Sequence, residues 1–226
     1  MRINYSLNNS GEYVIENYNL AKPFSSFLPS IAGLYGKPMW AYYVNRGQCI
    51  AAMGINNKDY SILEFVPANK AYRQTTTQGF RTFLKIKRAD GRITRYEPFR
   101  PAADSDGSDG PDGIIQRMYI TSHDFRLEEI NRTLGLKIDV LYCTLPGESL
   151  SALIRKVKIS NLSGQKLEIE SLDGLPVIIP YYITNGDLKD MSNLRQAWMG
   201  VEHDEEIPFY KIKVLPYDSP EIVFVE

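Results

Sequence analysis

The stretch KPMWAYYVNRGQCIAAMGIN, residues 37–56, decides the fold of this 226-residue chain. Met39 to Val44 is rich in aromatic and apolar residues, and Cys49 to Gly54 forms a second, near-continuous apolar run. Asn45-Arg46-Gly47 lies between them and favours a turn, because Asn and Gly both tolerate positive φ. A strand pair that is apolar on both faces is typical of the centre of a sheet packed against another layer. The stretch therefore predicts the central hairpin of a large β core.

Composition limits the classes of protein that the chain can represent. With 43% apolar and 12% aromatic residues it can bury one large β domain or two small ones. The 26 basic residues nearly cancel the 27 acidic ones. We therefore expect no nucleic-acid or membrane partner, because either would require a clustered basic excess.

The N-terminal residues and the cysteines indicate a reduced, intracellular protein. Residues 1–18 alternate apolar and polar side chains without the apolar run of a signal peptide or a membrane anchor, so we expect a cytoplasmic location. Cys49 and Cys143 are too few and too far apart for a disulfide scaffold or a CxxC site. We expect both to be reduced within strands, with no metal bound.

Short alternating segments predict strands over most of the remaining chain. We expect them at residues 2–7, 12–18, 60–65, 80–88, 92–96, 114–120, 124–131, 136–144, 150–160, 166–172, 209–215 and 221–225. Asp90-Gly91 predicts a type I′ turn between two of them. Pro and Gly among apolar residues at 21–36 indicate an ordered loop instead of a helix.

The segment ADSDGSDGPDG, residues 103–113, is acidic and rich in glycine. We interpret it as an exposed loop, since nothing after its first alanine could anchor it in a core. The alternative is a calcium loop built on Asp104, Asp106, Asp109 and Asp112. The spacing argues against that alternative, because the EF-hand Gly and the final Glu are missing.

Alternation is clearest in residues 154–174, where apolar residues recur at two-residue spacing with charged residues between them. One face of these strands should be buried and the other exposed to solvent. Lys156 and Lys158 could pair across the strands with Glu168 and Glu170 if the register brings them together, for a few tenths of a kcal/mol each.

One helix is expected, from Asp187 to Met199, with apolar residues at helical spacing, Asn185 as its cap and Gly200 at its end. We expect its Trp198 to be buried against the sheet. The chain stops inside an apolar run, which suggests the front part of a longer protein. Short strands with regular turns, one or two short helices and no βαβ rhythm predict an all-β fold, a large antiparallel sandwich.

A complete active site is not evident in the sequence. His123 and His203 lie far apart without a partner pattern, and we interpret both as surface or capping residues. GxSxG, Walker A, GxGxxG and HExxH motifs are all missing from the sequence. Carboxylates are plentiful, but sequence cannot show the separation that a glycosidase pair requires. We therefore assign no catalytic residue.

One group of residues has the chemistry of a sugar site, with aromatic, amide and cationic side chains in PANKAYRQTTTQGFRTF. These candidates are Asn69, Lys70, Tyr72, Arg73, Gln78 and Arg81. A loop between two strands would collect such residues anyway, and we favour that plainer interpretation.

The chain also resembles a known family. The segments NLAKPFSSFLPSIAGLYGKPMWAYYVNRGQCIAAMGI, EFVPANKAYRQTTTQGFRTF, RKVKISNLSGQKLEIESLDGLPVIIPY and NLRQAWM together resemble the N-terminal domain of cellobiose-phosphorylase-like proteins. These are the inverting β-glucan phosphorylases of glycoside hydrolase family 94 and their oligoglucan phosphorylase relatives. The similarity covers nearly all of the chain, and the first and third segments are the more specific.

The resemblance implies a galactose-mutarotase-like β-supersandwich over residues 1–226, followed in the family by a helical linker and an (α/α)6 barrel. In the family an aspartate of that barrel is the general acid, and inorganic phosphate attacks the anomeric carbon in place of water. The barrel has no counterpart in this sequence, so no catalytic or phosphate-binding position is carried over. The resemblance thus implies a scaffolding, dimerisation or substrate-loop role, with a β-glucan oligosaccharide, the missing catalytic domain and a second copy as partners and no cofactor beyond the phosphate co-substrate.

Two other classes of function remain open. A stand-alone carbohydrate-binding module would need exposed aromatic side chains, and Trp40, Tyr42 and Tyr43 would have to face solvent. An aldose epimerase of the same fold would need an acid and a base in one cleft, and the shortage of histidine makes it the weakest alternative.

Overall fold

The computed structural model describes residues 3–30, 34, 36–101, 113–179, 183–191, 199–205 and 207–212. Strands dominate this part of the chain, and each pair of neighbouring strands in it runs antiparallel. The structure confirms the predicted all-β, antiparallel sandwich with two short α-helices.

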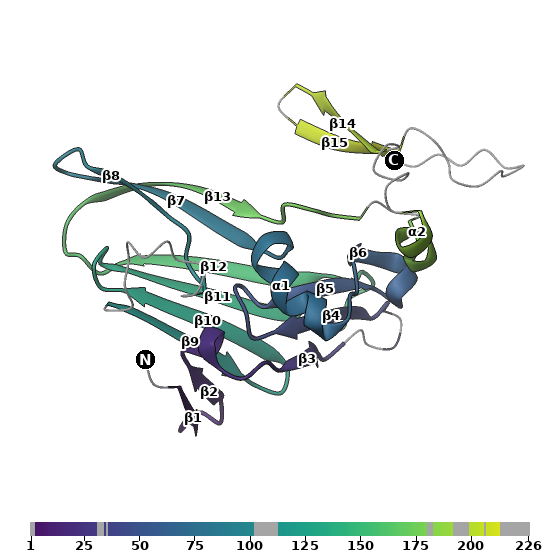
Figure 1. The fold of residues 1–226 in the computed structure, drawn as a ribbon, viewed down its shortest axis with the longest axis horizontal. Helices are drawn as coiled ribbons and strands as arrows, with labels where there is room; N and C mark the ends of the chain where they lie inside the picture. The colour runs from purple at the N-terminus through teal and green to yellow at the C-terminus, as the bar shows by residue number, and fades with distance from the viewer. Residues whose placement is uncertain are drawn as a thin grey trace, which may run out of the picture.

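One layer of the sandwich is a six-stranded sheet, seen in the lower half of Figure 1. Its strands lie in the order β1 (Asn4–Leu7), β2 (Tyr13–Glu16), β9 (Ile114–Ile120), β10 (Asp124–Asn131), β11 (Leu136–Thr144) and β12 (Leu153–Asn161). In β11 alternate residues from Leu136 to Thr144 are buried, as the two-residue period requires. This sheet therefore has one core face and one outer face.

Two smaller sheets form the second layer. The four-stranded sheet has the order β3 (Ser25–Leu28), β4 (Met39–Val44), β5 (Ile50–Ile55), β6 (Ser61–Leu63). The three-stranded sheet has the order β13 (Leu167–Gly174), β7 (Arg81–Arg88), β8 (Ile93–Tyr96). Buried residues of β4, β5 and β7 share one core with those of β9, β10 and β11.

The β4–β5 hairpin is central and covered on both faces, as predicted. Ala41 and Tyr43 face the main core, and the ring centroid of Tyr43 lies 4.7 Å from that of Phe125 in β10. Tyr42 and Val44 face the other way, into a smaller cluster. Helix α1 (Ala68–Gln78) covers that second face through Ala71 (Figure 1). Each large apolar side chain buried in this way contributes about 1.5–3 kcal/mol.

The remaining described elements belong to none of these three sheets. They are the 3₁₀ turns η1 (Tyr18–Leu20) and η2 (Lys58–Tyr60), helix α2 (Asn185–Asp190), and the strands β14 (Met199–Asp204) and β15 (Ile207–Ile212), which pair as a hairpin. This hairpin stands apart from the two layers in Figure 1. No helix in the described ranges is long and apolar enough to cross a membrane.

Two predictions about helices were wrong. Residues 68–78, interpreted as loop, form α1. The helix predicted from Asp187 to Met199 begins at Asn185, with Thr184 and Asp187 forming a capping box, and ends at Asp190. Gly200 lies in β14 and does not end a helix. Trp198 lies outside the described residues, as do nearly all of the acidic segment and the strand predicted at 221–225.

Three predictions about strands and turns also need correction. Residues 25–28, inside the predicted loop, form β3. The turn at Asp90-Gly91 has positive φ only at Gly91, and the Gly91 N–H donates to the Arg88 carbonyl, which indicates a three-residue type I turn with a bulge instead of type I′.

The third correction concerns the pairing of β13. This strand does not pair with β12, which precedes it in the chain, but with β7 in the other layer. Glu168 and Glu170 therefore form ion pairs with Lys87 and Lys85 at 3.2 and 3.0 Å, not with Lys156 and Lys158. Both pairs are exposed, so each contributes at most about 1 kcal/mol.

Candidate functional site

A cavity of about 530 Å³ lies where α1 ends and β7 begins. The β4–β5 turn forms one side of it, and the segment Glu97–Pro101 forms another. Its lining includes polar and cationic side chains and two aromatic residues, Phe80 just before β7 and Phe99. The lining residues are Gly47, Gln48, Arg73, Thr76, Thr77, Phe80, Arg81, Glu97, Pro98, Phe99, Arg100 and Pro101.

Helix α1 brings its C-terminal turn to this cavity because its buried side faces the four-stranded sheet. Ala71 and Thr75, one turn apart, are both buried there. The helix ends at Gly79, whose N–H donates to the Thr75 carbonyl at 3.1 Å. A Cβ at Gly79 would lie 2.7 Å from the Ile50 carbonyl oxygen, so only glycine allows this close approach.

Of the six residues proposed as a sugar site, the structure brings two to the cavity. Arg73 and Arg81 line it. Asn69, Lys70 and Gln78 are exposed and outside its lining. Tyr72, also in α1, is half-buried and packs against the cluster that contains Tyr42 and Val44. The structure thus places two of the six candidates at one cavity, and it carries five of the six on α1 and Arg81 on β7 instead of in a loop.

Arg81 and Glu97 form a two-point ion pair across one side of the cavity. Nε of Arg81 donates to Oε1 of Glu97 at 2.7 Å, and Nη2 donates to Oε2 at 3.0 Å. The hydrogen bonds that Arg81 donates to Glu97 raise the pKa of Arg81, and burial opposes this rise. The pair fixes both side chains in a planar arrangement, and the guanidinium charge offsets that of the Glu97 carboxylate.

Two further guanidinium groups remain available at the cavity. Arg73 and Arg100 are both exposed, and within the described part of the chain neither guanidinium has a hydrogen bond or ion pair. The described residues of the lining therefore include three arginines and one glutamate, which together carry a net charge of +2.

The Glu97–Pro101 side of the cavity is held by a buried carboxylate. Glu129 is 1% exposed and accepts hydrogen bonds from the Phe99 N–H at 2.6 Å, from Gln116 Nε2 at 2.8 Å and from the Tyr96 hydroxyl. Burial raises the pKa of Glu129, and these hydrogen bonds oppose the rise. Phe99 has φ of +64°, a left-handed conformation that costs a non-glycine residue about 1–2 kcal/mol. Strain of this kind persists only where the surroundings impose it.

Asn19, just after β2, joins this strained segment to the β4–β5 turn. Its Nδ2 donates to the Phe99 carbonyl at 3.2 Å and to Gln116 Oε1 at 2.8 Å, and its Oδ1 accepts from the Gly47 N–H at 2.7 Å. The Tyr18 hydroxyl donates to the Gly47 carbonyl at 2.5 Å. Two sides of the cavity are therefore fixed to each other through buried polar groups.

Arg155 of β12 stabilises the cavity from beneath. Its Nη2 donates to Gln48 Oε1 at 2.6 Å and to Asp173 Oδ1 at 2.9 Å, and its guanidinium lies 4.8 Å from the ring centroid of Phe80. Hydrogen bonds from Arg155 and Thr82 lower the pKa of Asp173 despite its partial burial. This arginine links three sheets at the base of the site.

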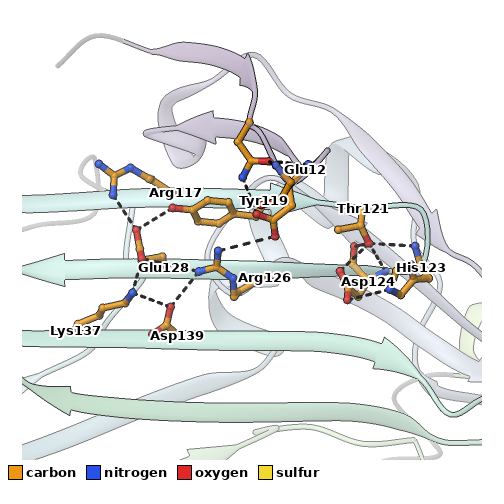
Figure 2. Close-up of polar contacts among 12 residues, drawn as sticks. Glu12, Arg117, Tyr119, Thr121, His123, Asp124, Arg126, Glu128, Lys137 and Asp139 are labelled. Atoms are coloured by element: carbon orange, nitrogen blue, oxygen red, sulfur yellow. Dashed lines mark hydrogen bonds and ion pairs between the residues drawn. The ribbon is translucent and has the colours of Figure 1, made fainter.

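A second polar cluster lies on the outer face of the six-stranded sheet (Figure 2). The register places Glu16, Arg117, Glu128, Asp139 and Lys158 in one row across β2, β9, β10, β11 and β12. Glu128 accepts from Arg117 at 2.8 Å and from Lys137 at 2.6 Å, and the Tyr119 hydroxyl donates to it at 3.1 Å.

The carboxylates of this outer cluster are already paired. Burial raises the pKa of Glu128, but hydrogen bonds from Lys137, Arg117 and Tyr119 outweigh it and lower the pKa overall. Asp139 contacts Arg126 at 3.2 Å and Lys137 at 3.5 Å. Figure 2 shows these side chains pointing toward one another. The cluster therefore stabilises the sheet face, and we choose the cavity as the candidate site.

The histidines and cysteines contribute nothing to the cavity lining. His123 lies on the exposed turn between β9 and β10, beside Asp124, and His203 is exposed in β14. Cys49 is buried and Cys143 half-buried, and both are free thiols. Burial raises the pKa of both thiols, so they are poor nucleophiles. Among the described residues, no three His, Cys, Asp or Glu side chains gather as metal ligands would.

A scan against models of protein families finds no match to this chain, and a search of curated proteins finds none either.

Sequence reasoning missed most of the cavity. Glu97, Phe99 and Arg100 line it, and Asn19, Gln116 and Glu129 hold it, but all are distant from the PANKAYRQTTTQGFRTF segment. One signal was present. Glu129 falls on the same alternation as Phe125 and Leu127, which places a charged residue on the core face of β10.

Proposed function

We propose that this chain is the N-terminal β-supersandwich domain, of the galactose-mutarotase-like kind, of a cytoplasmic inverting β-glucan or cellobiose-type phosphorylase. In this proposal the longer protein converts β-glucosides and phosphate to α-glucose 1-phosphate. This domain supplies scaffold, dimer contacts and a wall of the glucan site, and it is inactive alone.

The observation that carries the proposal is the position, in the sequence, of the residues that line the cavity. Gly47 and Gln48 belong to the first segment through which the chain resembles this family, and Arg73, Phe80 and Arg81 belong to the second. Two of the segments that carry the resemblance therefore meet at this cavity, although most of their residues lie in the sheets and the core.

The side chains of the cavity suit a sugar. Arg81 and Glu97 present a fixed plane of donors and acceptors, which matches vicinal hydroxyl groups. Phe80 presents an apolar ring, which suits the C–H face of a pyranose. A volume of about 530 Å³ has the size of a small-molecule site.

In this proposal the catalytic domain of the longer protein carries out the phosphorolysis. Among the described residues of the cavity lining, Glu97 is the only carboxylate, and its pairing with Arg81 leaves it poorly suited to act as the general acid. The chain accordingly binds and positions substrate, and the acid comes from elsewhere in the longer protein.

Phosphate release and consumption by a longer protein that contains this chain test the proposal directly. The substrates are β-1,2-, β-1,3- and β-1,4-gluco-oligosaccharides, with the 226-residue chain measured beside it. We expect activity with one linkage in the longer protein only, and Arg81→Gln to raise KM for the oligosaccharide. Lack of phosphorolysis with all three linkages would contradict the proposal.

A stand-alone carbohydrate-binding module is the second candidate, and one observation favours it. The rings of Phe27 and Phe65 are 51% and 36% exposed, stack at a 26° interplanar angle and have centroids 6.0 Å apart. Of the three aromatic residues that this alternative required to face solvent, Tyr42 and Tyr43 are buried and Trp40 is half-buried. Retention of the chain on an oligosaccharide gel that is lost in Phe65→Ala but kept in Arg81→Gln would favour the module.

A further inference from the structure

We infer that the free edge of β12 is a docking site for an extended peptide segment of another protein, which adds to the six-stranded sheet as a further strand. In this segment acidic and apolar residues alternate. β12 is the last strand of the sheet, and in the described part of the chain it pairs with β11 alone. The inference concerns a strand edge and not the cavity, so it is independent of the proposed function.

The backbone of β12 offers hydrogen-bonding groups along this edge. At the two ends of the β11–β12 pair, the Leu145 N–H donates to the Ala152 carbonyl at 2.9 Å and the Leu162 N–H donates to the Gly135 carbonyl at 2.7 Å. Because bonding to one neighbour alternates along an antiparallel strand, the even-numbered residues of β12 bond to β11, and the N–H and C=O groups of the odd-numbered residues point away from it. The odd-numbered residues are Leu153, Arg155, Val157, Ile159 and Asn161. No described strand pairs with them.

Two lysines on the outer face of β12 determine the kind of strand that this edge would accept. Lys156 and Lys158 are exposed, and neither forms an ion pair with a described residue. Asp139 of β11 lies opposite Lys158, but its carboxylate already contacts Arg126 and Lys137 at 3.2 and 3.5 Å. The row of charges across the sheet therefore ends on a lysine that an acidic residue in a further strand would pair.

The acidic strand of the chain itself does not fill this place. β13 follows β12 and alternates acidic and apolar residues, but it pairs with β7, where Glu168 and Glu170 bind Lys87 and Lys85. β12 is thus left with basic side chains on its outer face and mostly apolar, partly buried side chains on its inner face. A strand with acidic residues outside and apolar residues inside would match both faces.

A second copy of this chain is a poor occupant of the same edge. Two copies related by a two-fold axis would pair β12 with β12 in antiparallel fashion. An axis centred on Lys156, Val157 or Lys158 places lysine opposite lysine, which is destabilising, and an axis nearer either end shortens the pairing. Lysines on edge strands prevent self-association in this way in many proteins. The same charges therefore disfavour a copy and favour an acidic strand.

Fluorescence polarisation with the 226-residue chain tests the inference. The probe is a labelled peptide of alternating Val and Glu, long enough to span β12 and blocked at both ends. One control peptide has Gln in place of Glu. A second control is N-methylated on its Val residues, whose N–H groups would face β12, so that it cannot donate the backbone hydrogen bonds.

Variants of the chain test the same two contributions from the other side. Lys156→Gln, Lys158→Gln and the double variant remove the charges, and Lys70→Gln is the matched control because Lys70 is exposed on α1. Val157→Pro removes an N–H that points away from β11. Proline is tolerated on an edge strand at such a position, so this variant should fold, which circular dichroism checks. If it does not fold, the N-methylated peptide still tests the backbone bonds.

We expect the Glu peptide to bind the wild type and Lys70→Gln equally. It should bind each single lysine variant about two- to fivefold more weakly and the double variant about tenfold more weakly. Its affinity should fall as salt is raised, because the charges are exposed. The Gln peptide should bind the wild type about tenfold more weakly than the Glu peptide, and neither the N-methylated peptide nor Val157→Pro should show binding.

Three binding results would overturn the inference: no binding of the Glu peptide to the wild type, equal binding to the wild type and the double lysine variant, or equal binding of the N-methylated peptide. A wild-type dimer in analytical ultracentrifugation that Val157→Pro dissociates would also overturn it, because a second copy would then occupy the edge.

Discussion

Glu129 Oε2 accepts a hydrogen bond of 2.6 Å from the backbone N–H of Phe99, a residue held at φ of +64°. The carboxylate lies on the core face of β10, and the strained residue lines the cavity. The shape of the candidate site therefore depends on a charged group that solvent does not reach.

The first prediction is that Glu129→Gln destabilises the fold by about 1–3 kcal/mol, because the amide cannot accept from all three donors. The deficit should depend on pH. The pKa of Glu129 is raised in the folded state, so its contribution to stability is fully present below the ordinary glutamate pKa and is lost as pH rises through the folded value.

Urea unfolding between pH 4 and pH 8 measures this difference. The free-energy gap between wild type and Glu129→Gln should narrow as pH rises. A gap that widens with pH would mean that the folded pKa of Glu129 is lowered.

The second prediction concerns Glu128, the residue before Glu129, and its pH dependence has the opposite sign. Its pKa is lowered in the folded state, so its contribution is present above the ordinary glutamate pKa and is lost as pH falls through the folded value. Glu128→Gln should therefore cost about 1–3 kcal/mol near pH 7 and progressively less in acid. The same unfolding series tests it, and a deficit independent of pH would contradict the ion-paired cluster of Figure 2.

The third prediction concerns the link between Arg155 and Asp173. The Arg155 side chain is 8% exposed and bonds to Asp173, Gln48 and Thr82. Breaking such a pair from one side leaves a charge without its partner, so Arg155→Gln should cost about 2–4 kcal/mol. A double-mutant cycle with Asp173→Asn should give a coupling energy of about 1–3 kcal/mol. Additive effects would show that the two side chains do not interact in solution.

The fourth prediction tests the packing of the central hairpin. A Cβ at Gly54 would lie 2.4 Å from the Tyr60 carbonyl oxygen and 2.8 Å from Ser61 Cα, both backbone atoms. Gly54→Ala should therefore cost about 1–3 kcal/mol in thermal or urea unfolding. Gly186→Ala in α2, where the nearest atom is 3.7 Å away, is the control and should be neutral or slightly stabilising. Equal stability of the two variants would place β5 and η2 farther apart than the structure does.

The local sequence was sufficient to predict the bounds of the strands with the clearest residue patterns. The predicted bounds of β4, β9, β10 and β11 match the structure. Helix α1 escaped prediction because Thr75-Thr76-Thr77 are β-branched and Pro67 offers no side-chain cap. Its stability comes from packing Ala71 and Thr75 onto the sheet, which a local pattern cannot show.

Long-range relationships could not be predicted in the same way. The turn at Ser163-Gly164 predicts a hairpin, yet β13 pairs with β7, because the choice of partner depends on which layer buries Ile169. The cavity likewise joins Gly47, Arg73 and Phe99, residues that only the tertiary fold brings together. The sequence could name Arg73 and Arg81 by chemistry but not the carboxylate that holds the opposite wall.

The most direct test of the cavity as the functional site is a ¹H–¹⁵N NMR titration of the 226-residue chain with the β-gluco-oligosaccharide that supports phosphorolysis. We predict that shift changes concentrate on the backbone amides of Gly47, Arg81 and Phe99, and that they disappear in Arg81→Gln. Shifts confined to the Phe27 and Phe65 surface, or no shifts at saturating sugar, would contradict the account.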